Sequence, residues 1–398
     1  GAEQTISSIT FNTIIFSGGG TKKITGNLTI GGNVNILPNI EVIGSNYNIT
    51  IYGNWRNQGT FVSKGDVNFA GDIQTITSTE FSTLHLSGTG NKIALGNVTI
   101  QKNFIVDEGT QFSSGEYIHT INGNILSYQN INEETSTFVL HGDFPQTISP
   151  ITLFNAEVNN SSGIFLSGQL TILHSMHIAQ GDVHTDNSFI ELGMNATLTE
   201  TPGNRIIGKV FSLRPIEIGT VQNFGNIGLE LLINGQHPGP TMVTRFTGIQ
   251  LNGSENFPES QSIQRYFVVT PTENQNLDAQ IILHYDDDEL QNQNEQSIDI
   301  WSTVNSGMQW KKNPVLTHRN TETNTDTIKN ISSVSLFTFA DSENPLYGAT
   351  IKVKKYYDFD GDNTTGNDQT AKFWNMEIRS ASSGGNIISA VLSDSIVR

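Results

Sequence analysis

Short runs in which apolar and polar residues alternate recur along the first half of the chain. They are four to eight residues long and end at Gly or Asn, as in Lys23–Ile30, Val34–Leu37, Ile49–Tyr52 and Leu170–Leu173. Alternation with period two places one side of a strand in a core and the other in solvent. No window longer than ten residues has a convincing helical period, so the pattern predicts a nearly all-β chain.

One phrase occurs three times at nearly equal intervals, as Gln4–Ser7, Gln74–Thr77 and Gln146–Ser149. Such repetition is typical of an array whose units stack and share one core. Each unit has room for roughly three turns of about 20 to 25 residues, so residues 1–205 are predicted to form a β-solenoid, or parallel β-helix. The Asn residues are interpreted as stacking or turn-making. Because Gly1 falls inside a repeat, we expect the chain to be part of a longer protein.

The composition shifts after Pro202, and residues 206–342 are predicted to form a second domain. Strands every 8 to 15 residues with Trp and Phe anchors, among them Ile263–Pro271, Gln280–Tyr285 and Ser333–Phe339, favour an antiparallel, Ig-like β-sandwich. The acidic stretch Asp286–Glu289 is expected in a solvated loop at a strand end. Residues 343–398 are expected to begin a third module, which the chain leaves incomplete.

The third module contains the best candidate site, an acidic loop between two predicted strands. Three aspartates at alternate positions can turn toward one point if the loop curls at Gly361 and Gly366, and a fourth closes the shell from the far side. The candidate ligands are Asp358, Asp360, Asp362 and Asp368. Hard oxygen ligands at this spacing suit Ca²⁺, although Asn363 and Gln369 depart from the EF-hand pattern. The alternative is a solvated acidic turn without an ion.

The net charge and the composition limit the classes of molecule that the chain is expected to bind. The net charge is −17 with a pI near 4.8, so nucleic acid and anionic lipid are poor partners, whereas divalent cations fit. There is no Cys, which excludes disulfides and thiolate metal sites. No apolar run approaches the length that a membrane-spanning segment needs, so no membrane insertion is expected.

Two other function classes compete with a structural role. A solenoid polysaccharide-degrading enzyme needs paired carboxylates, but the acids of the array are scattered and no nucleophile motif is present, so the chain is not expected to be an enzyme. A carbohydrate-binding module needs exposed aromatics, for which Tyr52, Trp55, Phe61 and Tyr117 are candidates, although core packing also explains them. The histidines at 174, 177 and 184 are interpreted as surface or stacking residues.

The residues Gly53–Phe61, continued through Val67–Gly71 to Gln74, resemble repeats of large secreted surface proteins of Bacteroidetes-type bacteria. The stretch from Gly208 to Ala340 resembles a module common in such proteins, and the third module resembles the prealbumin-like B repeats of bacterial adhesins, whose acidic loop is often a calcium site. The resemblance implies export by the type IX secretion route and attachment at the outer membrane.

These observations predict an extracellular structural or adhesive protein of the bacterial cell surface. The solenoid would supply length, the second domain would cap it, and calcium would stiffen the junction with the third module. Self-association into a filament or surface layer is expected because open solenoid ends and edge strands invite pairing. Other surface proteins and glycans are the further partners considered.

Overall fold

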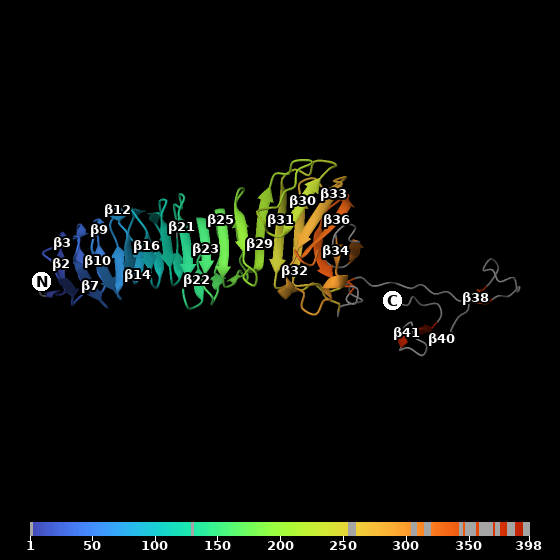
Figure 1. Cartoon of the computed structure of the whole chain (residues 1–398), viewed down its shortest axis with the longest axis horizontal. Helices are drawn as coiled ribbons and strands as arrows, with labels where there is room; N and C mark the ends of the chain where they lie inside the picture. Colours follow the sequence, from blue (N-terminus) through green and yellow to red (C-terminus); the bar gives the residue numbers. More distant parts are fainter. Residues whose placement is uncertain are drawn as a thin grey trace.

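The structure is a computed structural model in which an elongated all-β chain begins with a parallel β-solenoid over residues 4–212 (Figure 1). The described residues are 3–128, 131–253, 260–303, 309–313, 320–341 and 345–346, with the backbone of the short strands β38 (Tyr356–Tyr357), β39 (Gln369–Thr370), β40 (Asn375–Arg379) and β41 (Ile387–Leu392). The prediction of an all-β chain with an N-terminal β-solenoid is confirmed.

Each solenoid turn contributes up to three short strands, which stack in parallel on those of the next turn to form three faces. The first face holds β1 (Gln4–Ile6), β4 (Thr21–Ile24), β7 (Glu41–Ser45) and β10 (Thr60–Ser63), followed by β13 (Thr79–Phe81), β16 (Val98–Ile100), β19 (Ile118–Ile121), β21 (Thr137–His141), β23 (Ile151–Asn159) and β25 (Leu170–Gln180). β25 then pairs with both β27 (Ile190–Leu192) and β28 (Thr197–Glu200).

The second face is continuous along the rod and contains β2 (Ile9–Phe11), β5 (Leu28–Ile30), β8 (Ile49–Ile51), β11 (Asp66–Phe69), β14 (Thr83–Leu86), β17 (Phe104–Val106), β20 (Ile125–Ser127), β22 (Gln146–Ile148), β24 (Ile164–Leu166), β26 (Val183–His184) and the start of β29 (Ile206–Arg214). The third face contains β3 (Ile14–Phe16), β6 (Val34–Ile36), β9 (Trp55–Asn57), β12 (Gln74–Ile76), β15 (Gly90–Ala94) and β18 (Thr110–Ser113).

The turns of the solenoid differ in length. The register places Asp66 beside Thr83 in a short turn and Ile125 beside Ile148 in a long one. The short turns fall below the range of about 20 to 25 residues that the sequence suggested. Ile125 and Ile148 are both fully buried, so the core column continues through the long turn.

Inward residues of successive turns stack into apolar columns, which is why the alternating pattern specifies this fold. Leu28, Ile49, Val67, Leu84 and Phe104 follow one another along the second face, and each is at most 2% exposed. Such columns are shared by neighbouring turns, so no single turn has a core of its own.

An aromatic cluster fills the core near the fourth turn. The indole of Trp55 lies 4.9 Å from the ring of Phe61 and 5.7 Å from that of Phe81, and Trp55 and Phe61 are buried. Tyr117 packs partly buried against the core, whereas Tyr52 is 49% exposed. Of the four aromatics considered as a carbohydrate platform, Trp55 and Phe61 are therefore core residues.

Asparagines at the corners tie each turn to the next. The side-chain oxygen of Asn27 accepts a hydrogen bond from the backbone N–H of Asn48 at 3.0 Å, and that of Asn48 accepts from Asp66 N–H at 3.0 Å. Asn33 and Asn54 form a second ladder of this kind. The interpretation of these asparagines as stacking residues is confirmed.

The repeated Gln phrase has the same local role in its second and third copies. The Gln74 amide donates to the carbonyls of Ile51 at 3.0 Å and Gly53 at 2.5 Å, and its oxygen accepts from Gly71 N–H at 2.8 Å. Gln146 likewise donates to two carbonyls of the preceding turn, at 2.8 and 2.6 Å. Both side chains are at most 1% exposed, so each Gln supplies buried side-chain hydrogen bonds to backbone groups at the corner.

The three copies of the phrase do not lie on the same face. The first is in β1 on the first face, the second in β12 on the third face, and the third in β22 on the second face. Each repeat therefore advances by three full turns and two further faces. The sequence repeat and the structural turn are not multiples of one another.

The wall of the solenoid is interrupted on its first face between β10 and β13. The described ladders end at β10 and begin again at β13, and a notch of about 410 Å³ lined by Thr60, Val62, Thr79 and Glu80 among others lies there. On the third face β12 pairs with β9 only through Ile76 and Trp55. The second face, whose strands pair without a break, and the aromatic cluster connect the turns on either side of this interruption.

His119 is a buried titratable group in the solenoid core. Its Nε2 lies 2.9 Å from the Ser114 carbonyl, its Nδ1 has no hydrogen-bond partner, and its ring packs between Phe112 and Phe138. Burial lowers the pKa of His119, and the hydrogen bond to Ser114 only partly offsets this.

We expect acid to weaken the wild-type solenoid through His119. Below the ordinary pKa of about 6.5 the unfolded chain binds a proton that the folded chain does not, so stability falls by up to about 1.4 kcal/mol per pH unit until the lowered folded pKa is reached. His119→Phe should therefore lose less stability than wild type between pH 7.5 and pH 5.5 in urea titrations. The exposed His177→Gln is the control, and an unchanged pH dependence in His119→Phe would contradict the assignment.

Beyond the solenoid the pairing becomes antiparallel. β29 is the last solenoid strand, and its outer edge pairs with β31 (Thr241–Thr247) over seven residues, from Gly208 to Arg214. The sheet continues through β32 (Arg265–Pro271), β37 (Leu336–Ala340), β34 (Asp299–Thr303) and β35 (Lys311–Asn313).

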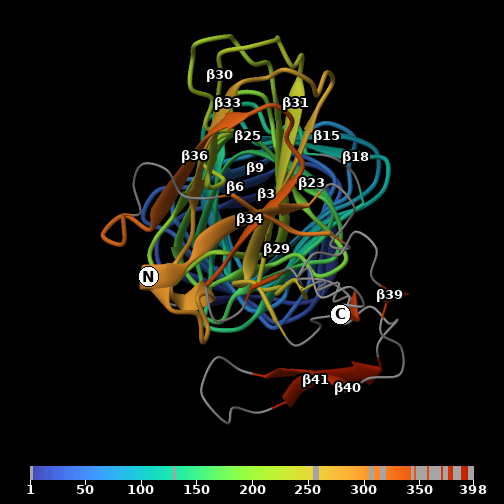
Figure 2. The ribbon, with the colours of Figure 1, turned by 90° about the vertical axis from the view of Figure 1, so that its right-hand side faces the viewer.

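A second antiparallel sheet contains β30 (Leu229–Ile233), β33 (Ala279–His284) and β36 (Thr325–Ile331), and the view along the rod places it beside the first (Figure 2). Two short 3₁₀ helices, η1 (Asp287–Glu289) and η2 (Glu295–Ser297), follow β33.

Candidate functional site at the end of the solenoid

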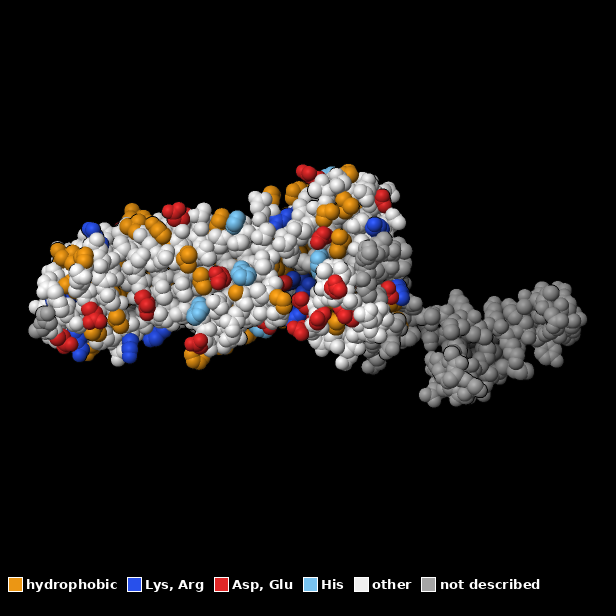
Figure 3. Space-filling model, viewed as in Figure 1, with side chains coloured by type: hydrophobic (Ala, Val, Ile, Leu, Met, Phe, Trp, Pro, Cys, Tyr) orange, Lys and Arg blue, Asp and Glu red, His pale blue; other side chains and the backbone are white. Residues whose placement is uncertain are grey.

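On the face that Figure 3 shows, charged side chains gather where the solenoid meets the antiparallel sheets, whereas those along the solenoid are scattered. The solenoid contributes Glu200 at the end of β28 and Arg205 in the loop before β29. The antiparallel strands contribute Arg245 in β31 and Arg265 in β32, and the segment after β33 contributes Asp286 and the residues of η1. The junction therefore draws its polar groups from both parts of the molecule.

Glu200 and Arg245 form a bidentate ion pair across the junction. The two guanidinium nitrogens of Arg245 lie 2.7 and 2.6 Å from the two carboxylate oxygens of Glu200. Arg245 is 1% exposed, and Glu200 also accepts a hydrogen bond from Ile206 N–H at 2.8 Å. Two charges paired in this bidentate geometry fix β28 relative to β31.

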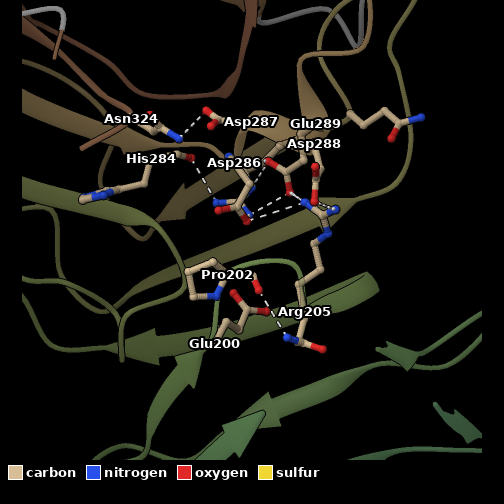
Figure 4. Close-up of polar contacts among 12 residues, drawn as sticks. Glu200, Pro202, Arg205, His284, Asp286, Asp287, Asp288, Glu289 and Asn324 are labelled. Carbon is tan, nitrogen blue, oxygen red and sulfur yellow. Dashed lines mark hydrogen bonds and ion pairs between the residues drawn. The ribbon is translucent and has the colours of Figure 1, made fainter. Parts of the chain in front are cut away.

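A second network is built around Glu289, which is 1% exposed (Figure 4). Arg265 pairs with both carboxylate oxygens of Glu289 at 2.8 Å and reaches Asp286 at 3.1 Å. Arg205 from the solenoid reaches Asp288 at 3.2 Å and Glu289 at 3.5 Å. η1 is thus held by one arginine from each side of the junction.

The two buried carboxyl groups have pKa values that move in opposite directions. Burial alone would raise the pKa of Glu200, but the charge and hydrogen bonds of Arg245 outweigh it and the pKa is lowered. Burial raises the pKa of Glu289, and repulsion from Asp286 adds to burial while Arg265 opposes it. The surroundings of Glu200 therefore favour its ionised form, whereas burial disfavours the ionised form of Glu289.

A cleft of about 500 Å³ opens above these ion pairs. Its floor contains Arg245, Arg265 and Glu200, its solenoid wall contains Thr199 to Pro202, and its opposite wall contains Asp286 and the turn at 322–324. His284 and Glu230 lie along it, with His284 Nε2 3.1 Å from the Glu230 carboxylate. The volume is that of a small-molecule site.

The interpretation of Asp286–Glu289 as a wholly solvated loop is wrong for Glu289. The segment does follow a strand, but it folds into η1, and Asp286 and Glu289 close it through a capping box. Asp287 and Asp288 remain exposed. The sequence could not show that two arginines, distant in sequence, meet this turn.

The histidine interpretation is confirmed for two of the three residues by ring stacking. The ring of His174 stacks on Phe154 at 4.9 Å, and that of His184 stacks on Phe165 at 4.6 Å. His177 is exposed beside Glu157 of the neighbouring strand.

The predicted calcium ligands Asp358, Asp360, Asp362 and Asp368 lie outside the described residues. Within the part of the chain that the structure describes, no group of three or more His, Asp or Glu side chains is placed to hold a metal ion. Among the same residues, no helix has the length and apolar character needed to cross a membrane.

Sequence reasoning missed Glu200, Arg205, Arg245 and Arg265. A signal was present for two of them, because Arg245 alternates with Val243 and Thr247, and Arg265 with Phe267 and Val269, in the inward phase of their strands. A charge in that phase indicates a buried ion pair.

No protein-family model matches this chain, and the comparisons with curated proteins and with solved structures found no match.

Proposed function

We propose that the chain is an extracellular structural or adhesive protein that acts as a stiff spacer on a bacterial surface. The observation that carries the proposal is the pairing of β29 with β31 over seven residues, which extends the solenoid sheet into the following strands without a linker. The ion pairs of Glu200 and Arg205 bridge the same junction. A rod whose core continues through its junction resists bending, which is the property that a spacer needs.

The finer parts of the proposal rest on the sequence. The two antiparallel sheets would be the faces of a β-sandwich that caps the solenoid, and residues 343–398 would begin a prealbumin-like module with Ca²⁺ at Asp358, Asp360, Asp362 and Asp368. The resemblance to secreted proteins of Bacteroidetes-type bacteria supports export by the type IX route and display at the outer membrane. Self-association or contact with other surface proteins would follow from that display.

The spacer function predicts a fixed distance across the junction. The chain has no Cys, so pairs of cysteines for spin labels can be introduced cleanly. We expect Glu108→Cys with Gln236→Cys, at exposed sites on either side of the junction, to give as narrow a distance distribution in pulsed EPR as Thr10→Cys with Glu108→Cys within the solenoid.

A broad distribution across the junction would contradict the spacer function. The same samples in Ca²⁺ and in chelator should agree, because the proposed calcium loop lies beyond both labels. Protection of residues 343–398 from proteolysis by Ca²⁺, lost in Asp360→Asn, would support the calcium site separately.

A further inference from the structure

The cleft at the junction has the size and polar lining of a ligand-binding site. We propose that it binds a neutral saccharide of one to three sugar units, a function that goes beyond the spacer and does not depend on it. The proposal rests on the cleft's volume of about 500 Å³ and on the kinds of polar group that line it.

The walls offer donors and acceptors together. Asn223, Asn226 and Asn324 each bring an amide with both, and the exposed Thr199 and Thr323 bring hydroxyls. Sugar hydroxyls also donate and accept, so a wall of mixed groups can satisfy several of them at once. A lining of carboxylates alone would instead favour a cation.

The floor distinguishes between ligand classes. The Nε of Arg245 is buried and has no hydrogen-bond partner, although its two terminal nitrogens are held by Glu200. Its exposed surface is too small for a ligand to reach it, and because the Glu200 carboxylate is already paired with Arg245, the floor offers no free charge to an ammonium group. Anions are disfavoured because Glu230, Asp286 and Glu322 also line the cleft.

The site is already formed before any ligand arrives. The Glu200–Arg245 pair fixes the floor, and the contact of Asn324 with Asp287 at 2.8 Å holds one wall against η1. Gly228 lies on the cleft with φ of 93°, and a Cβ there would come within 3.1 Å of the Arg265 guanidinium. A polar site that is held open by ion pairs loses little freedom on binding.

The test is saturation-transfer NMR of the full chain with neutral probes at millimolar concentration: maltotriose, cellotriose, mannotriose, xylotriose, galactobiose and triacetylchitotriose. We expect at least one probe to receive saturation. Thr199→Trp, which places a ring in the cleft, should weaken its binding about tenfold or more. Thr197→Trp is the matched control, because Thr197 is exposed on the same side of β28 but does not line the cleft.

Three outcomes would overturn the proposal. The first is no transfer to any of the six probes. The second is binding that Thr199→Trp and Thr197→Trp leave equally unchanged, which would place the saccharide elsewhere. The third is binding of spermine or a lysine-rich peptide in this cleft with no saccharide bound. Circular dichroism of both variants shows whether the fold is retained.

Discussion

Arg245→Leu is expected to destabilise the protein by about 3–5 kcal/mol, because it leaves the carboxylate of Glu200 buried without its partner. The pair is bidentate, Arg245 is 1% exposed and the Glu200 side chain is 15% exposed, so solvent can replace only part of the lost contacts. Chemical denaturation followed by circular dichroism at pH 7 measures the loss. The double variant Glu200→Leu/Arg245→Leu should recover much of it, since it removes the orphaned charge as well.

A surface ion pair in the same sheet is the control for Arg245→Leu. The Lys312 ammonium lies 2.5 Å from the Asp299 carboxylate, but the lysine side chain is 39% exposed. Lys312→Leu should change stability by less than about 1 kcal/mol. If Arg245→Leu were as mild as Lys312→Leu, the junction pair would not fix the two parts of the molecule.

The lowered pKa of Glu200 gives the same pair a pH signature. Because the folded pKa lies below the ordinary value of about 4.3, the stability from the ionised carboxylate is fully present above that value and is lost as pH falls through the lowered pKa. The penalty of Glu200→Gln should therefore be constant from pH 7 to pH 5 and shrink at more acidic pH.

Gln74→Leu should cost about 2–4 kcal/mol, because the partly buried Gly53 carbonyl and Gly71 N–H lose their side-chain partner, while the Ile51 carbonyl keeps only its bond from Ala70 N–H. Leucine fits the space of the side chain but offers no polar atom. The measurement is the shift in the urea midpoint of the solenoid.

The chain supplies its own control for Gln74→Leu in the first copy of the phrase. Gln4 stands in the same phrase but is exposed, so Gln4→Leu should change stability by less than about 0.5 kcal/mol. Equal effects at both positions would mean that the hydrogen bonds of the buried Gln are not what stabilises the corner.

The solenoid was predictable from the sequence because its information is local. Inward Leu28, Ile49 and Val67 repeat at nearly the spacing of a turn, and corner asparagines such as Asn27 and Asn48 end the runs. A period-two pattern broken by turn residues leaves few alternatives for a chain that repeats. The exact turn length was less predictable, because the buried column continues from Ile125 to Ile148 even where the turn is longer.

The junction was not predictable in the same way. Glu200 and Arg245 lie 45 residues apart, and the sequence around either residue does not indicate that the two pair. The acidic run at 286–289 reads as a solvated loop until Arg205 and Arg265 are brought against it by the fold. Contacts made by distant strands depend on topology, which a single sequence does not reveal.

The length of the sequence repeat is not a whole number of solenoid turns, and this determines which faces of the rod present the repeated residues. Since each repeat advances by three turns and two faces, equivalent residues of successive copies point to different sides, and three copies visit all three faces. A partner that recognised the repeated surface could not bind all copies along one straight line parallel to the rod axis. One partner would have to wind around the axis, or several partners would have to bind from separate directions. The array is therefore suited to contacts on all three faces.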